Sequence, residues 1–111
     1  MNTAYSVKSE VSIKNENGTA RFNDDNCGSW IQHWKNYGGN DDFPLCCVKG
    51  CNNFAEHGAH VTRPNAKNEY YKTHLYIVPM CAHHNGMHGK ILTAVSGTVF
   101  VCANQAETCE K

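Results

Sequence analysis

The chain has 111 residues, with ten basic and ten acidic side chains, so its formal net charge at pH 7 is zero when histidine is neutral. This length favours a single small domain, close to the size at which a bound metal adds usefully to stability. The balanced charge excludes a basic nucleic-acid-binding surface over the whole molecule, but not a local basic face.

Neither a membrane span nor an export signal is expected. No apolar run approaches the roughly 18 residues that a spanning helix needs. The first ten residues, Met1 to Glu10, lack the charged, apolar and small-residue order of a secretory signal. The sequence therefore predicts a cytoplasmic protein that does not associate with membranes.

The N-terminal part predicts a β-hairpin followed by a short helix. Tyr5 to Phe22 alternates apolar and polar residues around the turn sequence Asn15 to Gly18. Ser29 to Tyr37 follows several helix-capping residues and places Trp30 and Trp34 on one helical stripe. We expect both tryptophans to be buried in the core.

The middle of the chain predicts a turn, two strands and a helix. Leu45 to Cys51 resembles a zinc knuckle, in which a glycine gives the backbone freedom to turn two sulfurs toward one point. Gly58 to Thr62 predicts a strand, and the polar stretch Arg63 to Lys72 predicts an external loop. Leu75 to Met80 predicts a buried strand, and Ala82 to Lys90 can begin a short helix.

The C-terminal part predicts a second hairpin. Apolar residues alternate from Ile91 to Val101 around the turn sequence Ser96-Gly97. We therefore interpret residues 1–111 as one zinc-binding domain, with a hairpin and helix at 1–40, a zinc core at 44–90 and a hairpin at 91–111.

The seven cysteines favour metal binding over disulfides. An odd number cannot pair completely, and a reducing cytosol disfavours structural disulfides. A disulfide between Cys102 and Cys109 stays open as an alternative. So does a second metal site formed by Cys27, His33, Cys102 and Cys109.

Four residues have the spacing of a metal site: Cys46, Cys51, Cys81 and His84. Zn²⁺ prefers this mixture of thiolates and imidazole in tetrahedral geometry, and each short spacing lets two ligands come from one turn. Cys47 is the alternative to Cys46, and His83 is the alternative to His84. The sequence therefore predicts a structural Zn²⁺ that joins two distant turns.

Two elements around this site resemble a known family of nucleases. Gly58-Ala59-His60-Val61 on the first strand and Pro79 to Asn85 at the start of the helix are similar to the motifs of zinc-supported HNH, or His-Me finger, endonucleases. The resemblance covers about Cys46 to Lys90. It implies an α+β fold with a small zinc-bound ββα-metal, treble-clef-like core, here with flanking β-hairpins and a short N-terminal helix.

The resemblance also implies a metal-dependent endonuclease that hydrolyses phosphodiester bonds, with DNA as the expected substrate. Neutral His60 would take a proton from the attacking water. Asn85, and His88 one helical turn further on, would hold a separate catalytic Mg²⁺ or Mn²⁺ that stabilises charge on the phosphate.

The alternative hypothesis is a zinc module that recognises nucleic acid or a partner protein without cutting. Zero net charge favours this alternative. So does Ala59, which stands where many members of the family carry an acidic metal ligand.

Overall fold

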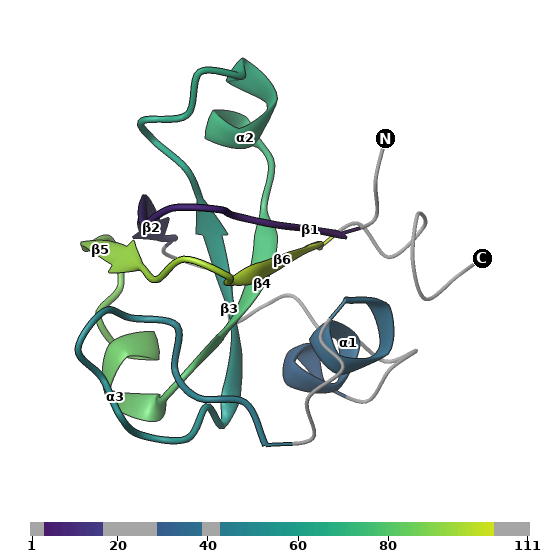
Figure 1. Ribbon diagram of the computed structural model, residues 1–111, viewed down its shortest axis with the longest axis vertical. Coiled ribbons are helices and arrows are strands. Elements are labelled where there is room, and N and C mark those ends of the chain that lie inside the picture. The colour runs from purple at the N-terminus through teal and green to yellow at the C-terminus, as the bar shows by residue number, and fades with distance from the viewer. Residues whose placement is uncertain (1–3, 17–28, 39–42, 104–111) are drawn as a thin grey trace.

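The computed structural model describes residues 4–16, 29–38 and 43–103. It is a small mixed α+β fold dominated by a curled antiparallel sheet (Figure 1). No helix in the described ranges is long and apolar enough to cross a membrane. The elements in chain order are β1 (Ala4–Ser6), β2 (Val11–Asn15), α1 (Trp30–Tyr37), β3 (His57–Thr62), α2 (Glu69–Thr73), β4 (Tyr76–Met80), α3 (Ala82–Asn85), β5 (Ile91–Ala94) and β6 (Val99–Cys102).

The six strands of the described segments lie in the order β1-β6-β4-β3-β2-β5, and neighbouring strands are antiparallel. The β1–β6 and β2–β5 pairs share one register, because Ala4 lies opposite Val101 and Lys14 opposite Ile91. Between the two pairs, the backbone N–H of Val7 donates to the carbonyl of Thr98 at 3.1 Å. Residues 4–14 and 91–101 therefore form one bent ribbon, and this bend curls the sheet.

The predicted C-terminal hairpin is wrong in its pairing. Both strands, β5 and β6, are present, but β5 pairs with β2, and β6 pairs with β1 and β4. The turn between them is tight, with Gly97 at a φ of +86°. β2 nevertheless occupies the edge of β5, and β1 and β4 occupy the edges of β6, that a local hairpin would use. Of the predicted N-terminal hairpin, Val11–Asn15 is a strand, and the second arm lies outside the described residues.

Helix α1 confirms the predicted helix and the burial of Trp34, whereas Trp30 is only partly buried. The capping residues expected ahead of Ser29 lie outside the described residues, and Ser29 itself is the N-cap. The Ser29 side chain accepts a hydrogen bond from the backbone N–H of Gln32 at 3.1 Å, which satisfies one free donor of the first turn. Trp34 is buried against Ile77 and Val101, and its indole N–H donates to the carbonyl of Val99 at 2.8 Å. These contacts fix α1 on β4 and β6.

The two faces of β3 and β4 pack against different structures. Ala59 and Val61 face the main core, which also holds Val78, Met80 and the buried cysteines. Gly58 faces the other way, because a Cβ atom on it would lie 2.5 Å from the backbone carbon of Trp30 in α1. Helices α1 and α3 accordingly lie on opposite sides of this strand pair (Figure 1).

Two details differ from the predicted elements. The expected external loop contains the short helix α2, whose first turn is capped by the Asn68 side chain, which accepts from the N–H of Tyr70 at 2.9 Å. Helix α3 ends at Asn85 rather than near Lys90. It ends early because Gly86 caps it, and Gly89 then adopts a φ of +77°, which a helix does not allow.

Candidate metal centre

Four predicted ligands meet at one point between the sheet and α3. Their donor atoms all lie within 4.8 Å of one another. The Nδ1 atom of His84 is 3.2 Å from the sulfur of Cys81 and 3.7 Å from the sulfur of Cys46, and the sulfurs of Cys51 and Cys81 are 3.9 Å apart. Tetrahedral zinc bonds would separate two sulfurs by about 3.8 Å, and a sulfur from a nitrogen by about 3.6 Å. The group could therefore hold a metal ion.

A tight loop supplies the first two ligands. The backbone N–H of Cys46 donates to the carbonyl of Asn53 at 2.9 Å, and that of Cys51 donates to the carbonyl of Val48 at 3.0 Å. Gly50 has a φ of +82°, in the left-handed region that favours glycine. The loop thus turns both sulfurs toward the same point, as the knuckle-like sequence predicts.

The end of β4 and the single turn of α3 supply the other two ligands. Cys81 occupies the N-cap position of α3, and its carbonyl accepts the N–H of Asn85 at 2.9 Å. His84 follows three residues later, so both side chains lie on one side of the turn. A rigid strand therefore sets the position of Cys81, and one helical turn sets that of His84.

The structure selects among the alternative ligands. Cys47 is only 3% exposed and belongs to the core, and burial raises the pKa of its thiol well above the usual range. His83 is exposed, and neither residue belongs to the four-donor group. Cys46 and His84, the preferred ligands of the sequence analysis, are the ones that converge.

The thiols of the site differ in proton affinity. Burial, with a smaller contribution from the neighbouring Cys81, raises the pKa of Cys46 to about 11. Burial also raises the pKa of Cys81, but hydrogen bonds with His84, Cys46 and Cys51 outweigh it and lower that pKa to about 7. A group of buried thiols is therefore poorly suited to carry several negative charges without a cation among them.

His60 lies on the α1 side of the sheet. Its ring packs edge-on against Trp30 with centroids 4.5 Å apart, and the side chain is only 5% exposed. Burial, and to a lesser extent the nearby His33, lowers the pKa of His60 to about 4. His33 is itself fully buried in α1, with its Nε2 atom 2.9 Å from the carbonyl of Cys102.

The other two candidate catalytic residues lie on the α3 side. Asn85 is the half-buried last residue of α3, and His88 is exposed in the turn that follows. The structure thus brings the four candidate ligands together, whereas His60 packs against α1 and Asn85 lies in α3, on opposite sides of the β3–β4 strand pair (Figure 1).

Two alternatives involve the cysteines near the ends of the chain: a Cys102–Cys109 disulfide and a second metal site. Cys102 is buried in β6, whereas Cys27 and Cys109 lie outside the described residues. The terminal disulfide and the second metal site therefore stay predictions.

Asn15 contacts helix α3, which carries the candidate ligand His84, and the sequence pattern does not predict this contact. Its side-chain amide donates to the carbonyls of His84 at 3.2 Å and of Asn85 at 2.9 Å. The sequence pattern assigned Asn15 to a hairpin turn, and about 70 residues separate it from its partners. No local signal reveals a contact of that range.

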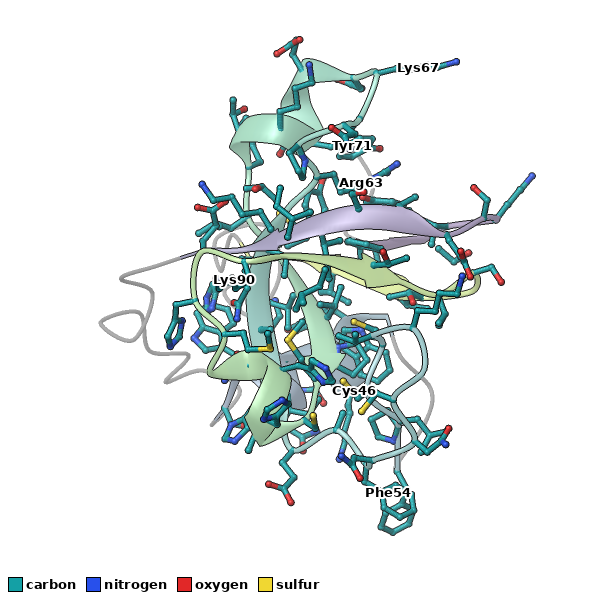
Figure 2. All side chains as sticks on the ribbon, turned by 90° about the vertical axis from the view of Figure 1, so that its left-hand side faces the viewer. Cys46, Phe54, Arg63, Lys67, Tyr71 and Lys90 are labelled. Atoms are coloured by element: carbon teal, nitrogen blue, oxygen red, sulfur yellow. The ribbon has the colours of Figure 1, made fainter. Side chains whose placement is uncertain are left out.

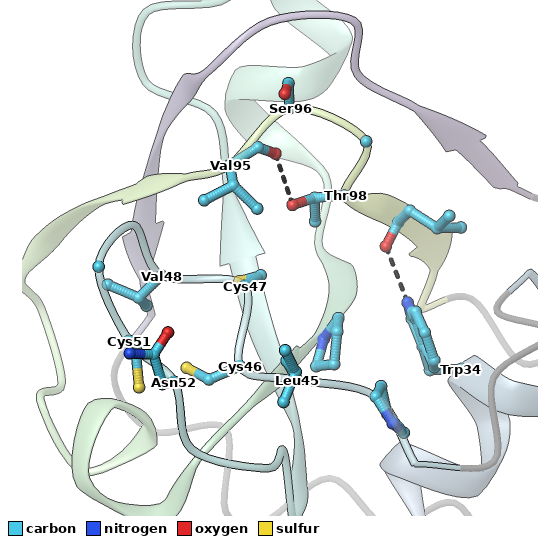
Figure 3. A pocket seen from close by; sticks show the side chains of 15 residues that line it. Trp34, Leu45, Cys46, Cys47, Val48, Cys51, Asn52, Val95, Ser96 and Thr98 are labelled. Carbon is cyan, nitrogen blue, oxygen red and sulfur yellow. Dashed lines mark hydrogen bonds between the residues drawn. The ribbon is translucent and has the colours of Figure 1, made fainter.

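A pocket of about 520 Å³ borders the metal-binding loop on the side away from α3 (Figure 3). The segment from Pro44 to Asn52 forms one wall, the turn from Val95 to Val99 forms another, and Trp34 lies at its side. The hydroxyl of Thr98 already donates to the carbonyl of Val95 at 2.7 Å. The Trp34 indole N–H is likewise engaged, so the pocket offers mainly apolar surface.

Comparisons of this chain with protein-family models, with curated proteins and with solved structures give no match.

We expect the buried His60 to make the protein less stable in mild acid. The pKa of His60 is about 4 in the folded chain and near 6.5 in the unfolded chain. Well above pH 6.5 the His60 imidazole is therefore neutral in both states. As the pH falls from 6.5 toward 4, the unfolded state takes up a proton that the folded state does not, and stability is lost. Between pH 7 and 5.5 the loss is about 1 kcal/mol.

Urea unfolding at several pH values, in excess zinc, measures this loss. His60→Gln should flatten the pH dependence relative to the parent protein. His57→Gln changes an exposed histidine on the same strand and should leave it unchanged. Equal slopes in all three proteins would assign the acid sensitivity to other groups.

Proposed function

We propose that Cys46, Cys51, Cys81 and His84 bind one structural Zn²⁺, and that the protein is a non-catalytic zinc-binding module. The observation that carries the proposal is the convergence of three sulfurs and one imidazole nitrogen within 4.8 Å. Zinc sites with four protein ligands are typically structural, because no position is left for water or substrate. Soft thiolates also favour zinc over magnesium or manganese.

The position of His60 supports a role without catalysis. A general base must come within hydrogen-bond reach of the water or substrate that it deprotonates. His60 is 5% exposed beneath Trp30, on the opposite side of the sheet from Asn85 and His88. A histidine that is buried against other aromatic rings typically contributes to packing.

Exposed apolar side chains near the metal-binding loop favour a protein as the partner. Phe43, Leu45 and Phe54 are 78%, 52% and 64% exposed, and Leu45 and Phe54 form a β-bridge at the base of the loop. Phe54 projects from the end of the molecule that carries the metal centre (Figure 2). Clustered exposed apolar groups are typical of protein-binding surfaces, whereas zero net charge provides little attraction for nucleic acid.

We expect one zinc per chain by elemental analysis of the purified protein. We also expect little binding to a fluorescent DNA or RNA oligonucleotide at low salt. Absence of zinc from the folded protein would contradict the metal proposal. Tight nucleic-acid binding that weakens steeply with salt would instead make nucleic acid the partner.

A metal-dependent endonuclease acting on DNA is the second candidate function. The order β3, α2, β4, α3, with His60 on the first strand and Asn85 directly after His84, favours it. In this hypothesis a catalytic Mg²⁺ or Mn²⁺ is a different ion from the structural zinc.

A plasmid-nicking assay separates the two functions. With Mg²⁺ or Mn²⁺ we expect no nicking by the parent protein beyond that of His60→Ala, whose zinc content is measured in parallel. Nicking that the parent performs and His60→Ala loses, at equal zinc content, would establish the nuclease and reject the non-catalytic proposal.

A further inference from the structure

The metal-bearing helix α3 is too short to hold its own shape. It has four residues, and a single helical turn in water is unstable without outside contacts. Its last carbonyl groups also need partners from outside the helix. The start of α3 is anchored by Cys81 at the end of β4, so the position of His84 depends on what holds the other end.

Asn15 holds that other end. It is the last residue of β2 and is 2% exposed. Its amide donates to the carbonyls of His84 and Asn85, at 3.2 and 2.9 Å. Its own backbone N–H donates to the carbonyl of Lys90 at 3.0 Å, and its carbonyl accepts from Gly89 at 2.5 Å. One buried residue therefore fixes both the end of α3 and the turn that follows.

We propose that Asn15 is a positioning residue of the metal centre, which keeps the Nδ1 atom of His84 directed at the sulfurs of Cys46 and Cys81. The inference rests on the proposed zinc site and adds the residue that orients its one imidazole ligand. Outer-shell partners of this kind typically change metal affinity by 10- to 100-fold when removed.

The chemistry of the contact explains why an amide is needed. An amide nitrogen carries two hydrogens and can donate to two carbonyls at once. A carboxylate of the same shape has no hydrogen to donate and would place its charge against two carbonyl oxygens. Asn15→Asp therefore leaves at most one donor, the proton of a neutral carboxyl group, where the amide has two, and the volume of the side chain is nearly unchanged.

The test measures Co²⁺ and Zn²⁺ affinity, with the Co²⁺ absorption spectrum as a report on the ligands. We expect Asn15→Asp to bind metal 10- to 100-fold more weakly than the parent. We also expect its Co²⁺ spectrum to change in the same direction as that of His84→Ala. Asn68→Asp is the matched control: it makes the same substitution at an exposed position where the side-chain oxygen only accepts a hydrogen bond. Its affinity should equal that of the parent.

A double variant distinguishes positioning from general destabilisation. If Asn15 acts through His84, Asn15→Asp combined with His84→Ala should bind metal no more weakly than His84→Ala alone. Independent losses that add together would overturn the inference, and so would parent-like affinity in Asn15→Asp. If Asn15→Asp does not fold, Asn15→Ser enters the same cycle, because its hydroxyl can donate to only one of the two carbonyls.

The outcomes for the two proposals are separate. A parent protein that binds neither Co²⁺ nor Zn²⁺ would overturn the metal site, and the inference with it. If the parent binds both metals and the Asn15 variants bind them as tightly as the parent does, the inference alone is overturned.

Discussion

Cys81→Ser is expected to abolish binding of the proposed zinc and, with it, cooperative unfolding. Cys81 is buried in the main core, at the point where β4 ends and α3 begins. Loss of its sulfur therefore removes the ligand that links the other three donors to the core. Structural zinc contributes about 10–16 kcal/mol of apparent binding free energy in small domains. That is comparable to the whole stability of a typical domain, about 5–15 kcal/mol. Zinc content and near-ultraviolet circular dichroism measure the two losses.

Cys47→Ser is the matched control for this experiment. Cys47 is as buried as Cys81, at 3% against 4% exposure, and its sulfur lies outside the four-donor group. The new hydroxyl in the core should cost about 1–3 kcal/mol, while one zinc stays bound. Equal loss of metal in both variants would show that core packing, and not ligation, holds the ion.

Gly58→Ala is expected to displace α1 from the sheet. The added methyl group would lie 2.5 Å from the carbon and 2.6 Å from the oxygen of the Trp30 carbonyl, and 2.7 Å from the nitrogen of Ile31. These are backbone atoms, so no side-chain rotation relieves the contact, and the helix must move. Overpacking of this kind costs about 1–3 kcal/mol. Urea unfolding measures it, and Trp fluorescence reports the environment of α1.

Gly86→Ala provides the comparison. Gly86 has a φ of −75°, and an added Cβ would lie 3.4 Å and 3.5 Å from the carbonyl oxygens of Ala82 and His83, which are ordinary contact distances. This substitution should leave stability within about 1 kcal/mol of the parent. If Gly58→Ala is equally harmless, the close approach of α1 to β3 is not present in solution.

Local patterns in the sequence account for the parts of the structure that were predicted. Trp30 and Trp34 of α1 face the sheet, as the helical spacing indicates. The short spacings of Cys46 with Cys51 and of Cys81 with His84 each form one turn, so each ligand pair could be recognised without its partner pair. The convergence of the two pairs follows from the preference of zinc for four tetrahedral Cys and His ligands.

Long-range pairing accounts for the parts that were missed. Alternation along β3 shows that Gly58 and His60 share a face, but it does not show which structure covers that face. Helix α1 covers it, and His60 is consequently buried away from α3. β2, the partner of β5, and β1, one partner of β6, likewise lie some 75 to 100 residues away, and the carbonyl partners of the Asn15 amide about 70, beyond any local signal.

The strand order has a consequence for how the molecule assembles during synthesis. β6 lies between β1 and β4, so the first strand to leave the ribosome waits for the last before it can join the sheet. All four metal donors, by contrast, have emerged before β6 begins. The candidate metal donors, like the β2–β3 and β2–β5 pairings, are thus complete in a nascent chain before β6, while closure of the β1 edge, which depends on the most distant contacts, follows slowly.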